Sequence, residues 1–124
     1  MKVLYIEDNP NNMHLVEKIL RASGYEMIGA EDGERGLLMA ETHRPKLILL
    51  DINLPDVDGY EIARRLRASE HEELAEVPIV AVTANALVGD DQKALDAGCT
   101  DYLPKPINIR DLRNCVARYL PISA

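Results

Sequence analysis

The stretch Leu47-Ile48-Leu49-Leu50-Asp51 decides the fold. Its four apolar residues follow one another without alternation, which is typical of a central parallel strand that is covered on both faces. An aspartate directly after such a strand is costly to bury unless the protein uses it. The stretch therefore predicts a parallel sheet, and a functional position where the central strand ends.

Strand-like and helix-like patterns surround this stretch. Further strands are predicted at 3–6, 25–30, 78–82 and 101–103. Helices are predicted over about 10–23, 34–42, a segment around 62–66, 86–97, and a last one with one side formed by Ile109, Leu112, Val116 and Tyr119. No helix is predicted in the polar stretch 69–76, and its run 70–73 is expected to be a solvated loop. The helix over 86–97, which contains Gly89, is expected to be the least firmly held. Five strands alternating with five helices predict one α/β domain over residues 1–124, with helices on both faces of the sheet.

The composition excludes several classes of protein. The chain has 124 residues, 47% of them hydrophobic, which is enough for a core without disulfide bonds. A formal net charge of −7, from 14 Lys and Arg against 21 Asp and Glu, argues against direct nucleic-acid binding and against attraction to anionic lipid. We expect a cytoplasmic protein without membrane insertion, because no apolar run could cross a bilayer and no leader precedes the first strand. Cys99 and Cys115 form neither a disulfide framework nor a zinc site, and we expect both to be buried as small apolar residues.

Polar residues stand where the predicted strands end. Parallel α/β sheets bind ligands at these carboxyl ends, which selects Glu7, Asp8, Asp51, Thr83 and Lys105. Three carboxylates at one edge raise each other's pKa, and a divalent cation relieves their repulsion. An oxygen-only site of this kind suits Mg²⁺ and leaves room for phosphate oxygens. Taken alone, Glu7-Asp8 would be a solvated pair, and only its combination with Asp51 favours a metal site.

The same residues suit phosphoryl transfer. The Asp51 carboxylate can attack phosphorus and form an acyl phosphate. Because the transition state spreads charge over three equatorial oxygens, the cation, the Lys105 ammonium and the Thr83 hydroxyl would each balance one of them. Lys105 lies between Pro104 and Pro106, and a cis Lys105–Pro106 bond is one of the two isomers open to it. Taken alone, Lys105 would be a surface lysine in a proline-rich turn.

Five separated motifs resemble those of response-regulator receiver domains, the CheY-like family. They are Glu7-Asp8-Asn9, Asp51 after its strand, Leu54-Pro55 with Asp58-Gly59, Ala81-Val82-Thr83-Ala84, and Lys105-Pro106-Ile107. Their order agrees over essentially the whole chain. The resemblance implies a flavodoxin-like (βα)5 three-layer sandwich with a five-stranded parallel sheet of order 2-1-3-4-5. Because only residues 121–124 follow the last helix, we expect a single receiver domain with no output domain.

The resemblance also implies a metal site around the phosphoacceptor. Asp51 is similar to the phosphoacceptor of the family, while Glu7 and Asp8 resemble the acidic pair that binds Mg²⁺, for which Mn²⁺ can substitute. Asp8 would be the direct ligand and Glu7 would act through water. Asn53 stands where the family uses a backbone carbonyl as a further ligand. Asn53 and Asn85 would also border the path of an attacking water and so tune the lifetime of the acyl phosphate.

A switch pair is implied by the same resemblance. Thr83 would move toward the phosphoryl group, and the ring of Tyr102 would turn inward. Lys105 resembles the phosphate-binding lysine, with Ala84 and Pro106 as supporting positions. Val57 stands where methionine is more usual, which predicts a change in packing only. Without the resemblance, Tyr102 would be half-buried packing. The histidines are expected at the surface without metal-binding roles, at positions His14, His43 and His71.

The function implied is a two-component phosphorelay switch, not an enzyme: it would catalyse only its own phosphorylation and dephosphorylation. A histidine kinase or histidine phosphotransfer protein would donate the phosphoryl group, docking beside Asn11, Asn12, Leu15 and the loop at Lys105. Output would be contact with a downstream protein through the helix over 86–97, the strand over 101–103 and the last helix. Within the family the chain looks closest to receivers of hybrid histidine kinases and to stand-alone cell-division regulators, which makes a sensor kinase one candidate target. We expect a monomer.

Other functions fit less well. A hydrolase that forms an aspartyl phosphate needs a general acid two residues after its nucleophile, where Asn53 stands. A nucleotide or flavin carrier needs a glycine-rich loop after the first strand, and Glu7-Asp8-Asn9-Pro10 would instead repel a phosphate. An interaction module that works without phosphorylation would have no need of the acid, threonine and lysine set.

Overall fold

The computed structural model describes residues 1–84 and 90–121, without the side chains of 90 and 91. Its strands are β1 Lys2–Ile6, β2 Glu26–Ala30, β3 Leu47–Asp51, β4 Ile79–Thr83 and β5 Asp101–Pro104. Its helices are α1 Pro10–Ala22, α2 Gly33–His43, α3 Gly59–Arg67, α4 Glu72–Glu76, α5 Asp90–Asp96 and α6 Ile109–Tyr119. All strands pair in parallel in the order β2-β1-β3-β4-β5. The predicted sheet order is confirmed.

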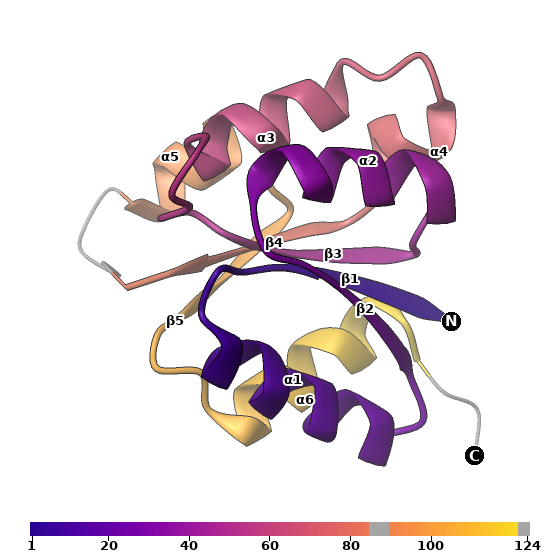
Figure 1. The fold of residues 1–124 in the computed structure, drawn as a ribbon, viewed down its shortest axis with the longest axis vertical. Helices are drawn as coiled ribbons and strands as arrows, with labels where there is room; N and C mark the ends of the chain where they lie inside the picture. The colour runs from indigo at the N-terminus through magenta and orange to yellow at the C-terminus, as the bar shows by residue number, and fades with distance from the viewer. Residues whose placement is uncertain (85–89, 122–124) are drawn as a thin grey trace.

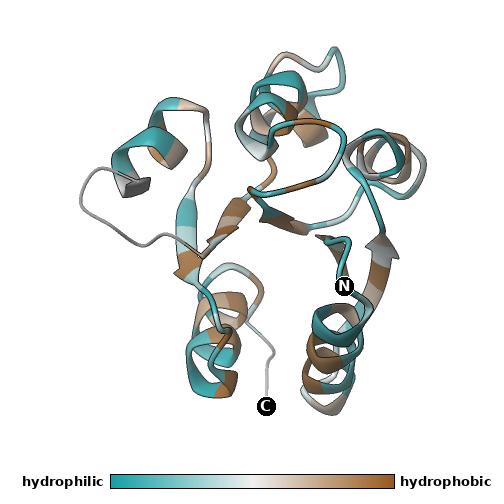
Figure 2. Cartoon of the chain, turned by 60° about the vertical axis from the view of Figure 1, so that its left-hand side comes forward, coloured by the Kyte–Doolittle hydropathy of each residue, from teal (hydrophilic) through white to brown (hydrophobic). Residues whose placement is uncertain are grey.

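Helices cover both faces of the sheet, as Figure 1 shows: α1 and α6 lie on one face, and α2, α3, α4 and α5 on the other. Successive strand residues point to opposite faces. Accordingly, the cluster on the α1–α6 face includes Val3, Tyr5, Leu47 and Leu49. The cluster on the other face includes Leu4, Ile6, Ile48 and Leu50. All residues of β3 and β4 are buried, and Figure 2 shows these central strands as mostly hydrophobic. This double coverage explains the unbroken apolar run in the sequence.

The helix starts follow the local sequence. The side chain of Asn9 caps α1 by accepting from the backbone N–H groups of Asn11 and Asn12, with Pro10 as the first helical residue. This arrangement was predicted from the Asn-Pro pair. Asp32 caps α2 in the same way by accepting from the backbone N–H of Arg35, so the helix begins at Gly33, one residue before the predicted start.

The loop predicted at 70–73 is wrong from Glu72 onward, where α4 begins. Leu74 in this helix is 1% exposed. Arg67 of α3 reaches this helix, because its guanidinium Nη1 donates to the carbonyls of Ala75 at 3.1 Å and of Val77 at 2.6 Å. Two adjacent apolar residues, Leu74 and Ala75, in an otherwise polar segment are too weak a pattern to predict a helix, so tertiary packing decides the conformation here.

The last helix departs from the prediction at one position. Leu112 and Val116 are fully buried, but Ile109 at the start of α6 is 48% exposed and does not join them. The predicted helix over 86–97 is represented by α5, while Asn85 and Gly89 lie outside the described residues. Cys99 and Cys115 are buried and unpaired, as predicted.

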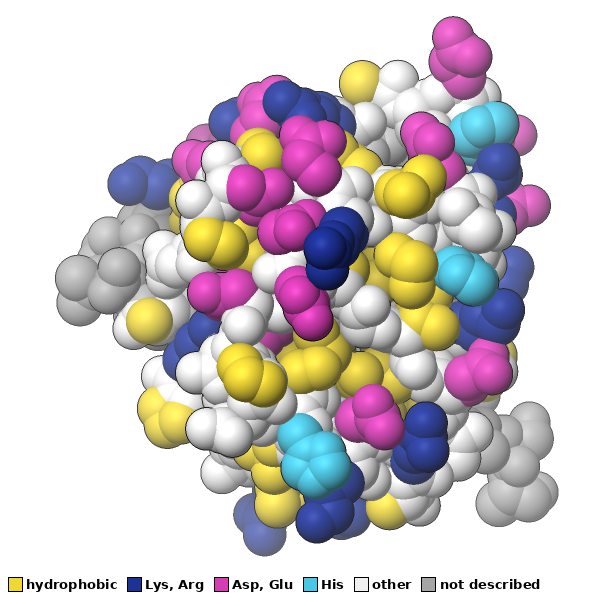
Figure 3. Space-filling model, viewed as in Figure 1, with side chains coloured by type: hydrophobic (Ala, Val, Ile, Leu, Met, Phe, Trp, Pro, Cys, Tyr) yellow, Lys and Arg dark blue, Asp and Glu magenta, His cyan; other side chains and the backbone are white. Residues whose placement is uncertain are grey.

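The surface mixes both signs of charge. Figure 3 shows acidic and basic side chains interspersed over the part of the face formed by α2 and α3. Among the ion pairs there, Arg65 contacts Glu34 and Glu61 at 3.3 Å each. Among the described residues no helix is long and apolar enough to span a membrane.

Candidate functional site

Two buried carboxylates meet at the carboxyl ends of β1 and β3. The register pairs Ile6 with Leu50, so the next residues along, Glu7 and Asp51, lie opposite each other and face the α1–α6 side. Both carboxylates are 1% exposed, whereas the neighbouring Asp8 is exposed. One carboxylate oxygen from each of the three residues lies within 4.8 Å of the others. Strand ends therefore bring together the acidic residues that the sequence selected.

Lys105 brings positive charge to these acids. It follows β5, and its backbone N–H donates to the carbonyl of Thr83 at 2.8 Å. Its Nζ lies 3.1 Å from Glu7 Oε1 and 3.2 Å from Asp51 Oδ2. Burial alone would lower the pKa of Lys105, but the charges of Asp51 and Glu7 outweigh it and raise the pKa. The ammonium therefore stays charged between the two carboxylates, and the Lys105–Pro106 peptide is cis.

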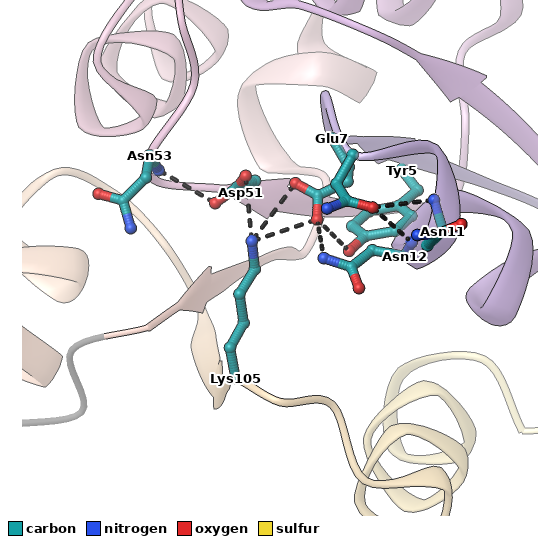
Figure 4. A network of polar contacts seen from close by, with 8 residues as sticks. Tyr5, Glu7, Asn11, Asn12, Asp51, Asn53 and Lys105 are labelled. Atoms are coloured by element: carbon teal, nitrogen blue, oxygen red, sulfur yellow. Dashed lines mark hydrogen bonds and ion pairs between the residues drawn. The ribbon is translucent and has the colours of Figure 1, made fainter.

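Glu7 is the most heavily hydrogen-bonded member of the site (Figure 4). Its Oε1 accepts from Asn12 Nδ2 at 2.6 Å and from the Tyr5 hydroxyl at 3.3 Å. Burial raises the pKa of Glu7 to about 7, and the hydrogen bond with Asp51 adds to this effect. The bond from Asn12 and the charge of Lys105 oppose the rise. One of the two buried acids therefore binds a proton more readily than an exposed glutamate does.

Asp51 is oriented by the loop that follows it. The backbone N–H of Asn53 donates to Asp51 Oδ1 at 3.0 Å. The loop closes where the N–H of Gly59 donates to the carbonyl of Ile52 at 3.0 Å. A Cβ on Gly59 would come within 2.5 Å of the Ile52 Cα, so only glycine permits this closure.

The predicted switch residues lie in different environments. Thr83, at the end of β4, is buried, whereas Tyr102 in the edge strand β5 is 40% exposed. The register pairs Tyr102 with Ala81 and Thr83 with Pro104. Ala84 and Pro106 are exposed. The structure thus places the ring of Tyr102 toward solvent. His14 and His71 are exposed, as expected for surface histidines, whereas His43 is half-buried.

The site suits a hard divalent cation. Its candidate ligands are carboxylate oxygens of Glu7, Asp8 and Asp51, and such oxygen donors are those that Mg²⁺ and Mn²⁺ prefer. The exposure of Asp8 leaves one side of the cluster open, as a site must be if it admits both a cation and phosphate oxygens.

The sequence did not indicate the contacts that three residues make in and around the site. Tyr5 and Asn12 both donate to Glu7, and Asp56 accepts from the backbone N–H groups of Gly33 and Glu34 at 2.9 and 3.2 Å. These bonds to backbone N–H groups lower the pKa of Asp56. For Tyr5 a signal was present, because residues two apart in a strand face the same side. For Asn12 and Asp56 no local pattern indicates the partner.

Comparison with known proteins gives the family. The family model for the response regulator receiver domain matches residues 3–117. The chain belongs to this family. Receiver domains are the phosphoacceptors of two-component signalling and interact with histidine kinases or phosphotransfer proteins.

Individual relatives agree with this assignment. The polar-differentiation response regulator DivK of Brucella anthropi is 41% identical over 118 residues, which is 95% of this chain and 94% of DivK. The receiver domain of the sensor histidine kinase PA1611 from Pseudomonas aeruginosa, solved with a magnesium ion coordinated in its active-site cleft, is 40% identical. Its TM-score is 0.87, with 98% of each chain covered. The chemotaxis protein CheY4 of Vibrio cholerae is 29% identical with a TM-score of 0.88, covering 95% of this receiver and 97% of that chain.

Proposed function

We propose that this receiver accepts a phosphoryl group on Asp51 from a histidine kinase or a histidine phosphotransfer protein, with Mg²⁺ bound beside it. The observation that carries the proposal is the position of Lys105 Nζ, 3.2 Å from Asp51 Oδ2 and 3.1 Å from Glu7 Oε1. A buried carboxylate at a strand end, with a cation already beside it, is arranged for a reaction that gathers negative charge at that place.

The proposed chemistry is an in-line transfer. An oxygen of the Asp51 carboxylate attacks the phosphorus, the O–P bond forms, and the P–N bond to the donor histidine breaks with its electron pair left on the imidazole nitrogen. Lys105 Nζ balances one phosphoryl oxygen and the Thr83 hydroxyl donates to another. Mg²⁺ or Mn²⁺ would be held by Asp8, Asp51 and the backbone carbonyl of Asn53, with Glu7 acting directly or through water. The bound cation would supply positive charge for the remaining phosphoryl oxygen. Water later hydrolyses the acyl phosphate, so the domain catalyses only its own phosphorylation and dephosphorylation.

The proposed response is a shift between two conformations. Thr83 moves toward the phosphoryl group, and the ring of Tyr102, now 40% exposed, turns inward. A groove beside this ring is supported by β5 and α6 and is lined by Asp101, Tyr102, Leu103, Pro104, Asp111, Asn114, Cys115 and Arg118. The α5–β5–α6 face would therefore present different surfaces in the two states to a downstream protein, for which a sensor kinase is one candidate.

The phosphoryl donor is proposed to dock beside α1 and the loop at Lys105, near Asn11, Asn12 and Leu15. A groove leads from Glu7 and Asp8 along α1 and is lined further by Pro10, Met13, His14, Glu17 and Glu31. Leu15 on the same helix is 40% exposed. A donor there would bring its histidine to the open side of the site. We propose that the domain acts as a monomer. We also propose that it acts in the cytoplasm, because its donor obtains the phosphoryl group from ATP.

The test is phosphorylation by a small acyl phosphate in the presence of Mg²⁺, followed by intact mass. We expect a Mg²⁺-dependent gain of one phosphoryl group that is absent from Asp51→Asn. Asp58→Asn is the matched control: it alters an exposed carboxylate of the same loop and keeps the cap of α3, so it should still gain the group. A gain that persists in Asp51→Asn would refute the assignment of the acceptor. Failure of the wild type to gain mass, or to shift the Tyr102 environment with beryllofluoride, would refute the function.

A further inference from the structure

One oxygen of Glu7 is crowded with donors and the other is not. Oε1 accepts from Asn12 Nδ2 at 2.6 Å, from Lys105 Nζ at 3.1 Å and from the Tyr5 hydroxyl at 3.3 Å. Oε2 accepts a longer contact from Lys105 Nζ at 3.4 Å, and the Glu7 carboxyl group also shares a hydrogen bond with Asp51. A carboxylate oxygen offers about two lone-pair sites, so Oε1 is saturated and Oε2 is the oxygen with capacity left.

The two neutral donors are themselves held in place. Tyr5 is fully buried within β1, two residues before Glu7, so its ring is fixed by the core on the α1–α6 face. Asn12 lies in the first turn of α1, where the cap residue Asn9 accepts from the backbone N–H of Asn12 at 3.2 Å. The donors therefore come from a rigid strand and from a capped helix start, and Figure 4 shows both pointing at Glu7.

We propose that Tyr5 and Asn12 are positioning residues of the metal site. They hold Glu7 through Oε1 and so leave Oε2 as the oxygen that serves the cation, directly or through water. The inference rests on the proposed function, because it assumes that a divalent cation binds here. A carboxylate that is oriented before binding loses less conformational freedom when the cation arrives, which is why partners behind metal ligands affect metal affinity.

The test is the Mg²⁺ dissociation constant, measured by calorimetry on the unphosphorylated protein. Asn12→Ala should weaken binding about tenfold, in the range seen when partners of metal ligands are removed. Tyr5→Phe removes only the hydroxyl, whose contact is the longer one, and should weaken binding by a smaller factor. The double variant should lose less than the product of the two factors, because both donors act on one oxygen.

Two matched controls separate positioning from general stability. Asn11→Ala changes the neighbouring exposed residue of α1. Tyr25→Phe removes another buried tyrosine hydroxyl, which donates to the Leu120 carbonyl at 2.6 Å and is not among the donors to Glu7. Both should keep the wild-type dissociation constant. Circular dichroism and thermal unfolding in EDTA establish whether each variant is folded. If Asn12→Ala does not fold, Tyr5→Phe alone provides the test.

The outcomes are distinct. Weaker Mg²⁺ binding in Tyr5→Phe and Asn12→Ala, with unchanged controls, supports the inference. An unchanged dissociation constant in both variants, or an equal loss in the controls, overturns it while leaving the proposed function standing. No Mg²⁺ binding by the wild type would overturn the proposed function instead.

Discussion

Two clusters in this protein combine a carboxylate, a cation and a tyrosine hydroxyl, yet they lie in different environments. The strand-end cluster consists of Glu7, Lys105 and Tyr5. The edge cluster consists of Asp101, Arg118 and Tyr119, in which Asp101 Oδ2 accepts from Arg118 Nη1 at 2.7 Å and from the Tyr119 hydroxyl at 3.0 Å. The side chain of the carboxylate is 0% exposed in the first cluster and 23% exposed in the second, and that of the cation is 20% exposed in the first and 63% in the second.

The difference shows that location, not residue type, decides what such a cluster can do. The edge cluster begins β5, at the amino end of a strand, where water screens its charges and the ion pair contributes little. The strand-end cluster lies at the carboxyl ends of β1 and β3, where a second buried acid, Asp51, leaves more negative charge than Lys105 can balance. Such an excess of buried negative charge favours binding of a cation.

The largest effect is expected from Lys105→Met. Removal of the ammonium leaves Glu7 and Asp51 together without a cation, so the unfolding free energy of the metal-free protein should fall by about 2 kcal/mol. This loss is smaller than the ~3–5 kcal/mol expected when a fully buried ion pair is broken, because Lys105 is partly exposed. Urea denaturation in EDTA at pH 8 measures this. Lys18→Met, at an exposed position of α1, is the control. An equal loss in both variants would mean that Lys105 contributes no specific charge balance.

Asp51→Asn should act in the opposite direction. Removing one of two neighbouring buried charges should raise the unfolding free energy of the metal-free protein by about 1–2 kcal/mol at pH 8. Saturating Mg²⁺ should reverse the order, since only the wild type gains fully from binding the cation. Thermal unfolding with and without Mg²⁺ tests both statements, and a variant no more stable than the wild type in EDTA would contradict the repulsion between the acids.

A pH dependence should follow from Glu7. Its pKa in the folded protein, about 7, is above the ordinary value of 4.5. Between these values the folded state binds more protons than the unfolded state, so the unfolding free energy of the metal-free protein should fall as pH rises from about 5 to about 7 and level off above. Urea midpoints of the wild type and of Glu7→Gln isolate this contribution. Parallel curves for the two proteins would show that Glu7 does not cause it.

The smallest effect is expected at the edge cluster. Asp101→Asn keeps the shape of the side chain and removes only its charge, so the unfolding free energy should change by no more than about 1 kcal/mol, and by less at high salt. Mg²⁺ affinity should not change. If Asp101→Asn altered Mg²⁺ binding as much as a change at Glu7, the two clusters would be coupled and the contrast drawn between them would fail.

Much of the fold and of the site follows from local patterns. The apolar run before Asp51, the Asn9-Pro10 helix start and the acids after β1 are features of consecutive residues, and each predicted its position because strand and helix periodicity need no distant partner. What local patterns did not show was packing between distant segments: the burial of Leu74, which makes α4 a helix, and the exposure of Ile109.

The sequence by itself determined the strands and the helices other than α4, the order of the strands through the family motifs, and which polar residues reach the strand ends. Only the tertiary structure decided how the residues around the site are held. Asn12 and Tyr5 donate to one oxygen of Glu7, Asp56 accepts from the start of α2, and the ring of Tyr102 is exposed to solvent. The physical reason is that a side chain's partner depends on strand register and on where a helix crosses the sheet. Both are set by the core as a whole and not by the residues beside it in the chain.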